Sequence, residues 1–362
     1  MQTIIFVLVS SITLVSCVIN DCPKYNKPKA STGGFTANSF LAFSAKLEDK
    51  FENKAGRLAE LPGALLEEDA DVVCLNEVFL ERDISTIFSQ VKKTYPYVYS
   101  SIHDGTTNNL LAATSSPCSF FRTIRLMFCL RKCKDLTDIK RILDCDIQYK
   151  CGAWESLKQE CITCEGAEGA GGVSSCTKKQ RVNVAGNMIL SKYPITKAES
   201  TFFVSDKQAN REGKLIVETA GRTIACTKMT SALNEDYYEP ETKELFSLSW
   251  AVENLSQAKC IMSNFQEQDK AILMGDLECG PAILSNNIRK EHELSYNNLT
   301  IQFDSPYVSD VGHQTNRDEY IITTHVMQKG YNGQHTCKRV FGGTYNGIKL
   351  SNQYGVKCTI PS

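Results

Sequence analysis

The chain has 362 residues, of which 42% are hydrophobic, so it can bury a core large enough for one large domain or two ordinary ones. Its 40 basic and 41 acidic residues leave a net charge of −1. This balance excludes the strongly basic class of proteins and gives no reason to expect a nucleic-acid partner.

The first residues have the pattern of a secretory signal. An apolar run at 4–15, followed by small residues up to Cys17, predicts a signal peptide at 1–17. The run is too short to span a bilayer. A secreted, extracellular protein also accounts for the 16 cysteines, because disulfides persist in oxidising compartments. Cleavage after Cys17 leaves an odd number, hence at least one free thiol or an intermolecular bridge. Asn254 and Asn298 begin glycosylation sequons.

Apolar spacing along the rest of the chain predicts both strands and helices. Alternation at 34–43 predicts a strand, and leucines at helical spacing predict a helix at 54–66 that Pro62 kinks or interrupts. Further strands are expected at 71–75, 95–100, 184–190, 214–218, 223–229, 271–274, 320–326, 338–341 and 354–360, and further helices at 84–91 and 244–265. This order indicates an α/β protein in which helices cover sheets.

Residues 104–180 interrupt the pattern. They contain eight cysteines, so we interpret the segment as a Cys-rich insertion held by disulfides. A zinc site is the alternative, but the C-x2-C pair of Cys161 and Cys164 lacks a second well-spaced pair or a nearby histidine. The stretch 119–130 mixes aromatic and basic residues, which fits either a membrane- or partner-facing surface or a small disulfide-braced helix packed on the main domain.

Two carboxylates directly follow buried strands. Glu77 comes after the apolar run at 71–75, and Asp276 after the run at 271–274. An acidic side chain at such a place is costly unless it has a partner. Either residue alone is explained as well by a hydrogen-bonded carboxylate as by a metal ligand, so the neighbouring motifs must decide.

Seven parts of the chain, taken together and in order, resemble the endonuclease/exonuclease/phosphatase family, and within it the secreted neutral sphingomyelinases most closely. They are Asn38, 71–79, 186–195, 226–229, 275–281, 317–322 and 350–356. The resemblance implies one domain at 23–362 that contains the insertion. It also implies a deoxyribonuclease-like α/β fold, a four-layer sandwich of two mixed β-sheets flanked by helices. Family members hydrolyse phosphodiesters or phosphomonoesters with Mg²⁺, which prefers oxygen ligands.

Carried over by position, the resemblance makes Asn38, Glu77 and Asp276 the metal-site residues, and all three are present. The family's other site positions hold different residues, so the active site is degenerate. Lys228 replaces a histidine of the family, and Glu278 replaces an asparagine. Glu319, or Asp318 if the register slips by one, stands at the acid of a late Asp-His or Asp-Tyr pair. Asn352 and Gln353 replace the closing Asp-His pair.

These replacements remove particular parts of the family's chemistry. Gln353 cannot take a proton near neutral pH, and losing a general base costs roughly 10²–10⁴ in rate. Lys228 keeps a cation without the pKa of an imidazole. Glu278 places an anion where a phosphate oxygen binds. We expect the Lys228 ammonium to pair with Glu278 or Asp276, because a buried carboxylate cluster without a cation is costly.

Two functions remain open at this point. The first is a secreted pseudoenzyme that acts by binding, with an unknown protein or lipid-surface partner on the Cys-rich insertion. The second is a Mg²⁺-dependent phosphodiesterase of sphingomyelinase type, in which Lys228, with a pKa depressed by burial, or Glu319 replaces the catalytic base. Mg²⁺ is the cofactor that the site implies, with binding expected to be weak or absent.

Overall fold

The computed structural model describes residues 22, 36–48, 52–121, 128, 132, 149, 158–168, 173–203, 212–231, 243–331 and 333–361. The signal peptide predicted at 1–17 lies outside these residues, and so do most of the stretch 119–130 and the insertion cysteines Cys129, Cys133, Cys145 and Cys151.

The strands form two mixed sheets. The first contains β1 (Ser39–Ser44), β2 (Val72–Asn76), β3 (Tyr97–Ser100), β4 (Met188–Ser191), β10 (Thr336–Val340) and β11 (Gly355–Thr359), in the spatial order β10-β11-β1-β2-β4-β3. The second contains β5 (Ile195–Phe202), β6 (Gly213–Thr219), β7 (Arg222–Lys228), β8 (Ala271–Asp276) and β9 (Thr324–Lys329), in that order. Each sheet has one parallel pair, β1 with β2 and β7 with β8.

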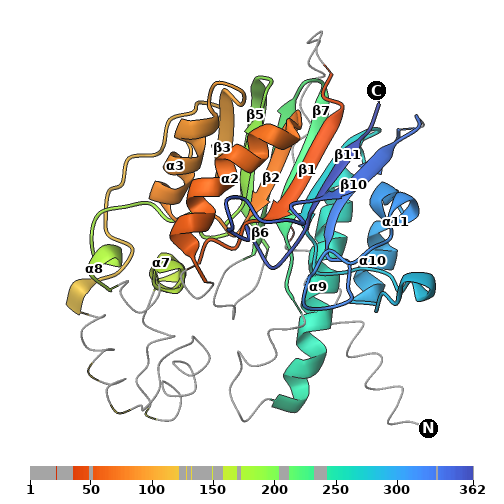
Figure 1. Ribbon diagram of the computed structural model, residues 1–362. Helices are drawn as coiled ribbons and strands as arrows, with labels where there is room; N and C mark the ends of the chain where they lie inside the picture. The colour runs from red at the N-terminus through yellow and green to blue at the C-terminus, as the bar shows by residue number, and fades with distance from the viewer. Residues whose placement is uncertain are drawn as a thin grey trace.

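Helices cover the outer face of each sheet, which gives four layers (Figure 1). The helices on the first sheet are α2 (Lys54–Glu68) and α3 (Glu81–Val91), and those on the second are α9 (Lys243–Phe265) and α10 (Glu293–Leu299). The short α11 (Pro306–Asp310) contacts β9 and β10, and η3 (Leu284–Asn286) is a single 3-10 turn. The predicted four-layer α/β sandwich is confirmed.

A fully apolar layer and a disulfide hold the two sheets together. Phe40 and Met274 are completely buried in the cluster between the sheets, and each buried Å² of apolar surface contributes about 25 cal/mol. The Cys74–Cys226 bridge joins β2 to β7 across this layer. It closes a loop with a sequence separation of 152, and bridges across long loops restrict the unfolded chain most. The ends of β2 and β7 are therefore fixed relative to each other.

The structure differs from the sequence prediction in three elements. The helix α2 runs through Pro62 without a break, because its buried face packs into the core on the first sheet and outweighs one lost backbone hydrogen bond. The edge strand β5 was not predicted, since its outer positions are charged or polar and break the apolar alternation. The strand expected at 320–326 begins only at Thr324.

The Cys-rich insertion connects β3 to β4 and contains α7 (Gln159–Glu168) and α8 (Val173–Cys176). The disulfides Cys118–Cys161 and Cys164–Cys176 confirm that it is stapled, and the zinc alternative is wrong because both sulfurs of the C-x2-C pair are already bonded. The bridged cysteines pack against Phe79. The insertion is therefore attached next to the strand end that carries Glu77.

Two further bridges, Cys22–Cys260 and Cys337–Cys358, tie the N-terminal region to α9 and β10 to β11. Among the described cysteines Cys279 is a free thiol, and it is buried. Across the described part of the chain, every helix is too short or too polar to cross a membrane.

Candidate functional site

The parallel strand pairs bring polar side chains to one edge of the sandwich. Ser44 and Asn76 are register partners at the ends of β1 and β2, and Lys228 and Asp276 are partners at the ends of β7 and β8. Asn76 joins the two sheets, because its amide donates to the Thr227 carbonyl at 3.1 Å and accepts from the Asp276 backbone N–H at 3.0 Å. Residues from both sheets therefore meet at this edge.

A lysine lies at the centre of the edge. The Lys228 ammonium is 3.0 Å from Glu77 Oε1 and 3.8 Å from Glu212 Oε1. The other Glu77 oxygen accepts from the Ser44 hydroxyl at 2.5 Å. The Lys228 side chain is 13% exposed, so the ion pairs are largely shielded from water. The ammonium lies among the carboxylates as expected, but its direct partners differ from the two predicted from the sequence.

Four carboxylates, Glu77, Glu212, Asp276 and Glu278, form what we call the acidic cluster. All four are buried, Asp276 completely. The Gln353 side chain faces Asp276, yet neither carboxylate oxygen of Asp276 has a hydrogen-bond partner of normal geometry among the described residues. Four buried carboxyl groups thus lie around Lys228, which contacts two of them directly.

The backbone of the cluster is held in conformations that side chains rarely adopt. The φ angles of Glu77, Glu278 and Lys46 are 61°, 49° and 48°. Each such residue costs of order 1–3 kcal/mol, and conformations of this kind gather at functional sites. Gly275, with φ of 136°, has no room for a side chain, because a Cβ would lie 1.8 Å from the Thr227 carbonyl oxygen. The surrounding packing therefore maintains the geometry of a site.

Burial and mutual repulsion raise the pKa of three carboxyl groups of the acidic cluster. Burial raises the pKa of Glu212 to about 8, although Lys228 opposes the shift. Burial also raises the pKa of Asp276 and, together with the charge of Asp276, that of Glu278 well above its usual range. Burial lowers the pKa of Lys228, but Glu77 and then Glu212 raise it by more, so its pKa lies well above the usual value. Lys228 is therefore a permanent cation.

Gln353, the residue that the sequence resemblance matches to the family's general base, is held inside the fold. It is 1% exposed, and its amide oxygen accepts from the Thr324 hydroxyl at 3.5 Å. The neighbouring Asn352 amide donates to Asp318 Oδ2 at 3.4 Å. Neither amide can take a proton from water, so the structure gives the closing motif a packing role.

The predicted pairing of Asn38 with Glu77 in a metal site is wrong. Asn38 precedes β1, at the end opposite to Ser44, and six residues of strand separate the two by roughly 20 Å. Its side-chain oxygen accepts from Arg222 at 3.2 Å instead. The site lies at the carboxyl ends of the parallel strands, so Ser44, a residue with one hydroxyl in place of an amide, stands beside Glu77.

The placement of Glu319 is also wrong. Its carboxylate lies 4.0 Å from Arg289, whereas the residue that contacts Gln353 is Thr324. Thr324 begins β9. Asp318, the residue expected if the register slips by one, accepts a hydrogen bond from the Asn352 amide at 3.4 Å, so its assignment to the late pair stays a prediction.

Sequence reasoning missed Ser44, Lys46, Asn76, Glu212 and Thr324. One available signal was the rule that parallel strands meet at their carboxyl ends, which points to Ser44 and Asn76 rather than to Asn38. Glu212 had no signal, because it precedes a strand in a polar stretch and reaches the cluster only through the pairing of β6 with β7.

The two sequons differ in the fold. Asn254 is fully buried on α9, and its amide donates to the Thr230 carbonyl at 2.7 Å and the Leu277 carbonyl at 3.3 Å. The predicted glycosylation of Asn254 is therefore wrong for the folded chain. Asn298 is half-buried at the end of α10, and its glycosylation stays a prediction.

The acidic cluster does not fit the Mg²⁺ that the fold family implies. Lys228 already neutralises Glu77, and Ser44 supplies a hydroxyl that donates to the same carboxylate. Within the described residues, the group of three potential ligand atoms closer than 4.8 Å to one another is that of Cys118, Cys161 and Glu165, and its sulfurs are in a disulfide. Asp276 alone keeps two unpartnered carboxylate oxygens.

No protein-family model matches this sequence, and no curated protein matches it either. Solved structures do share its fold. Sphingomyelinase C from Streptomyces griseocarneus is 14% identical with a TM-score of 0.51, covering 90% of this chain and 99% of that chain. The corresponding values are 12%, 0.51, 91% and 99% for SmcL, and 11%, 0.51, 90% and 99% for D. rerio TDP2 complexed with a single strand DNA product. These proteins have the endonuclease/exonuclease/phosphatase fold, so the fold expected from the sequence resemblance is confirmed.

Proposed function

We propose that this protein, which has the endonuclease/exonuclease/phosphatase fold, is a secreted pseudoenzyme that acts by binding. The observation that carries the proposal is the Lys228 ammonium, 3.0 Å from Glu77 and 3.8 Å from Glu212. An ammonium in that position supplies the positive charge that a divalent cation supplies in an active hydrolase, without its capacity to polarise a phosphate or activate water.

The loss of the base supports the same proposal. The buried amide of Gln353 cannot activate water. Lys228 and Glu319, the two residues considered as replacements for the base, do not act as one either. The pKa of Lys228 is raised rather than depressed, because Glu77 and Glu212 outweigh its burial, so it does not release a proton near neutral pH. Glu319 lies against Arg289, away from Gln353.

Extracellular binding is supported by the disulfides and by the shape that they preserve. Reduction in a cytosol would remove the bridge between the sheets and the staples of the insertion. We infer that the partner contacts the side of the molecule that carries the insertion. A protein or a lipid surface fits the balanced charge better than a nucleic acid does.

One observation favours the alternative, a Mg²⁺-dependent phosphodiesterase of sphingomyelinase type with an altered base. Both oxygens of Asp276 are buried and lack a hydrogen-bond partner of normal geometry in the described part of the chain. Buried polar atoms normally have a partner, and a bound cation would supply one. In this alternative Asp276 and Glu77 would hold the metal, which would polarise a bound phosphate, and Lys228 would have to give up its contact with Glu77.

The decisive assay is turnover of labelled sphingomyelin, DNA and inositol phosphates with Mg²⁺, beside a Glu77→Ala control. We expect no turnover above background by the natural chain. A variant combining Ser44→Asn, Lys228→His, Glu278→Asn, Thr324→Asp, Asn352→Asp and Gln353→His places the family's residues at the positions that we propose for them, and we expect it to gain activity. Turnover by the natural chain that disappears in Glu77→Ala contradicts the pseudoenzyme.

A further inference from the structure

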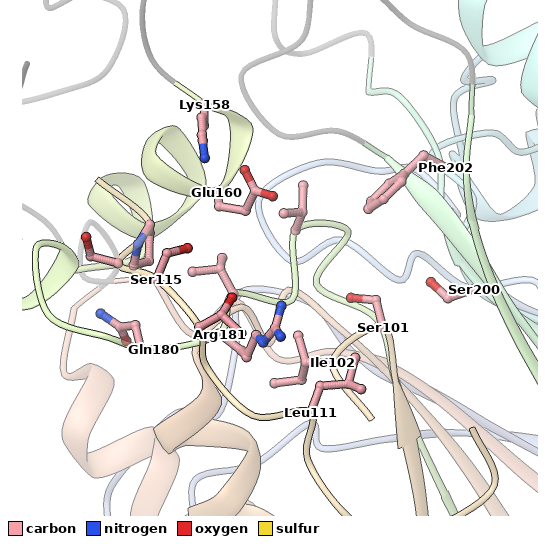
Figure 2. A pocket seen from close by; sticks show the side chains of 15 residues that line it. Ser101, Ile102, Leu111, Ser115, Lys158, Glu160, Gln180, Arg181, Ser200 and Phe202 are labelled. Carbon is pink, nitrogen blue, oxygen red and sulfur yellow. The ribbon is translucent and has the colours of Figure 1, made fainter. Parts of the chain in front are cut away.

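A cavity of about 310 Å³ lies between the insertion and the sandwich (Figure 2). We call it the insertion pocket. One wall comes from the sandwich, with Ser101 directly after β3 and Phe202 at the end of β5. The opposite wall comes from the insertion, with 114–117 and Lys158, the residue directly before α7. Its volume lies at the lower end of the range for sites that bind small molecules.

The pocket is separate from the acidic cluster. It is lined by none of the four carboxylates, and by neither Lys228 nor Gln353. Its lining combines an apolar base, which includes Val182 and Val184, with the hydroxyls of Thr114, Ser115 and Ser200. A ligand there does not touch the residues that replaced the family's catalytic groups.

The charges around the pocket favour an anion. Lys158, Arg181 and Glu160 line it, so two cations face one carboxylate. Figure 2 shows the Lys158 amine near Glu160 at one end of the pocket, the Arg181 guanidinium beside Ile102 and Leu111 at the other, and Phe202 across from both. A ligand that meets both sides needs an anionic group and an apolar body.

The walls are fixed before any ligand arrives. The Arg181 side chain donates through Nε to the Ala112 carbonyl at 3.0 Å, and its backbone N–H donates to Glu81 at 2.7 Å, which ties the insertion loop to α3. Cys118 directly follows the lining residue Pro117, and Cys161 directly follows the lining residue Glu160. The disulfide between them therefore ties two parts of the pocket wall together. A cavity with braced walls binds without losing much conformational entropy.

We propose that the insertion pocket binds a small amphipathic anion, with its anionic group at Lys158 and Arg181 and its apolar body against Phe202 and Val184. This inference deepens the proposed binding role and rests on it. The ligand class is a soluble molecule with one sulfonate, phosphate or carboxylate group on a hydrocarbon or aromatic body.

Anilinonaphthalene sulfonate (ANS) is a probe of this class, and phenylnaphthylamine offers the same rings without the charge. We expect the natural chain to bind ANS at one site, seen as a saturable rise in fluorescence, and to bind the neutral analogue at least tenfold more weakly. Lys158→Ala removes one charge-assisted contact and should weaken ANS binding roughly tenfold. Ser115→Trp fills the pocket and should abolish binding.

The matched control is Lys179→Ala, which removes an exposed lysine of the insertion that does not line the pocket. It should bind ANS as the natural chain does. No binding by the natural chain, equal binding by Lys158→Ala and Ser115→Trp, or equal affinity for the neutral analogue overturns the proposal. The turnover assay of the preceding section is independent of these readouts, so an active enzyme that still binds ANS would refute the pseudoenzyme and leave the pocket standing.

To separate a soluble ligand from a lipid in a bilayer, octyl phosphate below its micellar concentration and vesicles containing anionic phosphatidylserine compete with ANS. Displacement by octyl phosphate alone supports a soluble amphiphile. Displacement by the vesicles alone overturns that part of the proposal.

Discussion

The acidic cluster and the insertion pocket share no residue, and their charges differ. The cluster gathers four buried carboxylates around the resident cation of Lys228. The pocket is an open cavity with more cationic than anionic groups on its walls. The comparison contrasts a buried group of carboxyls that contains its own cation with an open cavity whose walls carry more cations than anions.

The largest expected effect follows from removing the resident cation. Lys228→Met leaves buried carboxylates without their counter-ion and should lower the free energy of unfolding by about 3–5 kcal/mol at neutral pH. Chemical denaturation measures this. Lys290→Met is the control, because Lys290 pairs with Glu293 at 3.0 Å on the surface, and such pairs contribute about 0–1 kcal/mol. Equal, small losses in both variants would mean that Lys228 is not the internal counter-ion.

The second-largest effect tests whether the Cys118–Cys161 disulfide holds the walls of the insertion pocket without affecting the acidic cluster. Replacing Cys118 and Cys161 together by serine removes one staple and should cost about 2–4 kcal/mol. ANS affinity should fall with it, because the pocket walls lose their brace, while the effect of Lys228→Met should be unchanged in this background. Unaltered ANS affinity in the double variant would show that the pocket does not depend on the insertion's bridge.

A pH-dependent effect tests the protonation of the cluster. Burial raises the pKa of Glu212 to about 8 in the folded chain. In the unfolded chain a glutamate loses its proton at about pH 4.3. Between these two pH values the folded chain therefore holds a proton that the unfolded chain has lost. Stability is lost as the pH rises from the lower value to the higher one. Glu212→Gln removes this loss, so we expect no difference from the natural chain near pH 4 and a growing gain toward pH 8, by at most ~1.4 kcal/mol per pH unit. Parallel pH curves of the melting temperature would contradict this.

The smallest effect concerns the support of the cluster. Asn254→Ala removes two hydrogen bonds, one of them to the carbonyl of Leu277 between Asp276 and Glu278, and should cost about 1 kcal/mol. Asn298→Ala should cost less, because its amide bonds a half-buried helix end.

Mass spectrometry of the secreted protein should find a glycan at Asn298 and none at Asn254. A glycan at Asn254 would require this face of α9 to be open.

The sequence predicts the fold well, because the layers depend on patterns that survive substitution. Buried runs such as 71–75 and 271–274 identify central strands, and both are confirmed as β2 and β8. The edge strand β5 was not predicted because most of its side chains are only partly buried and several are charged or polar. Pro62 led to the wrong prediction of a kinked or interrupted helix, because packing of α2 against the core outweighs the low helix propensity of proline.

The candidate site was predicted less completely, for a geometric reason. Glu77, Lys228, Asp276, Glu278 and Gln353 were identified because they lie at or near strand ends within recognisable motifs, and all five are buried or nearly so in the structure. Asn38 and Glu319 were misplaced because a motif without its neighbours does not fix which end or register of a strand reaches the site. Ser44, Glu212 and Thr324 became visible only through pairing between distant strands.

Calorimetric titration of Mg²⁺ into the natural chain and Lys228→Met tests the central claim, that Lys228 fills the place of the metal. Lys228→His serves as a second variant that keeps a polar side chain, and circular dichroism confirms that each is folded. We predict no binding by the natural chain and saturable binding by the variants, lost again when Glu77→Ala is added. Saturable Mg²⁺ binding by the natural chain that Glu77→Ala abolishes would contradict the account.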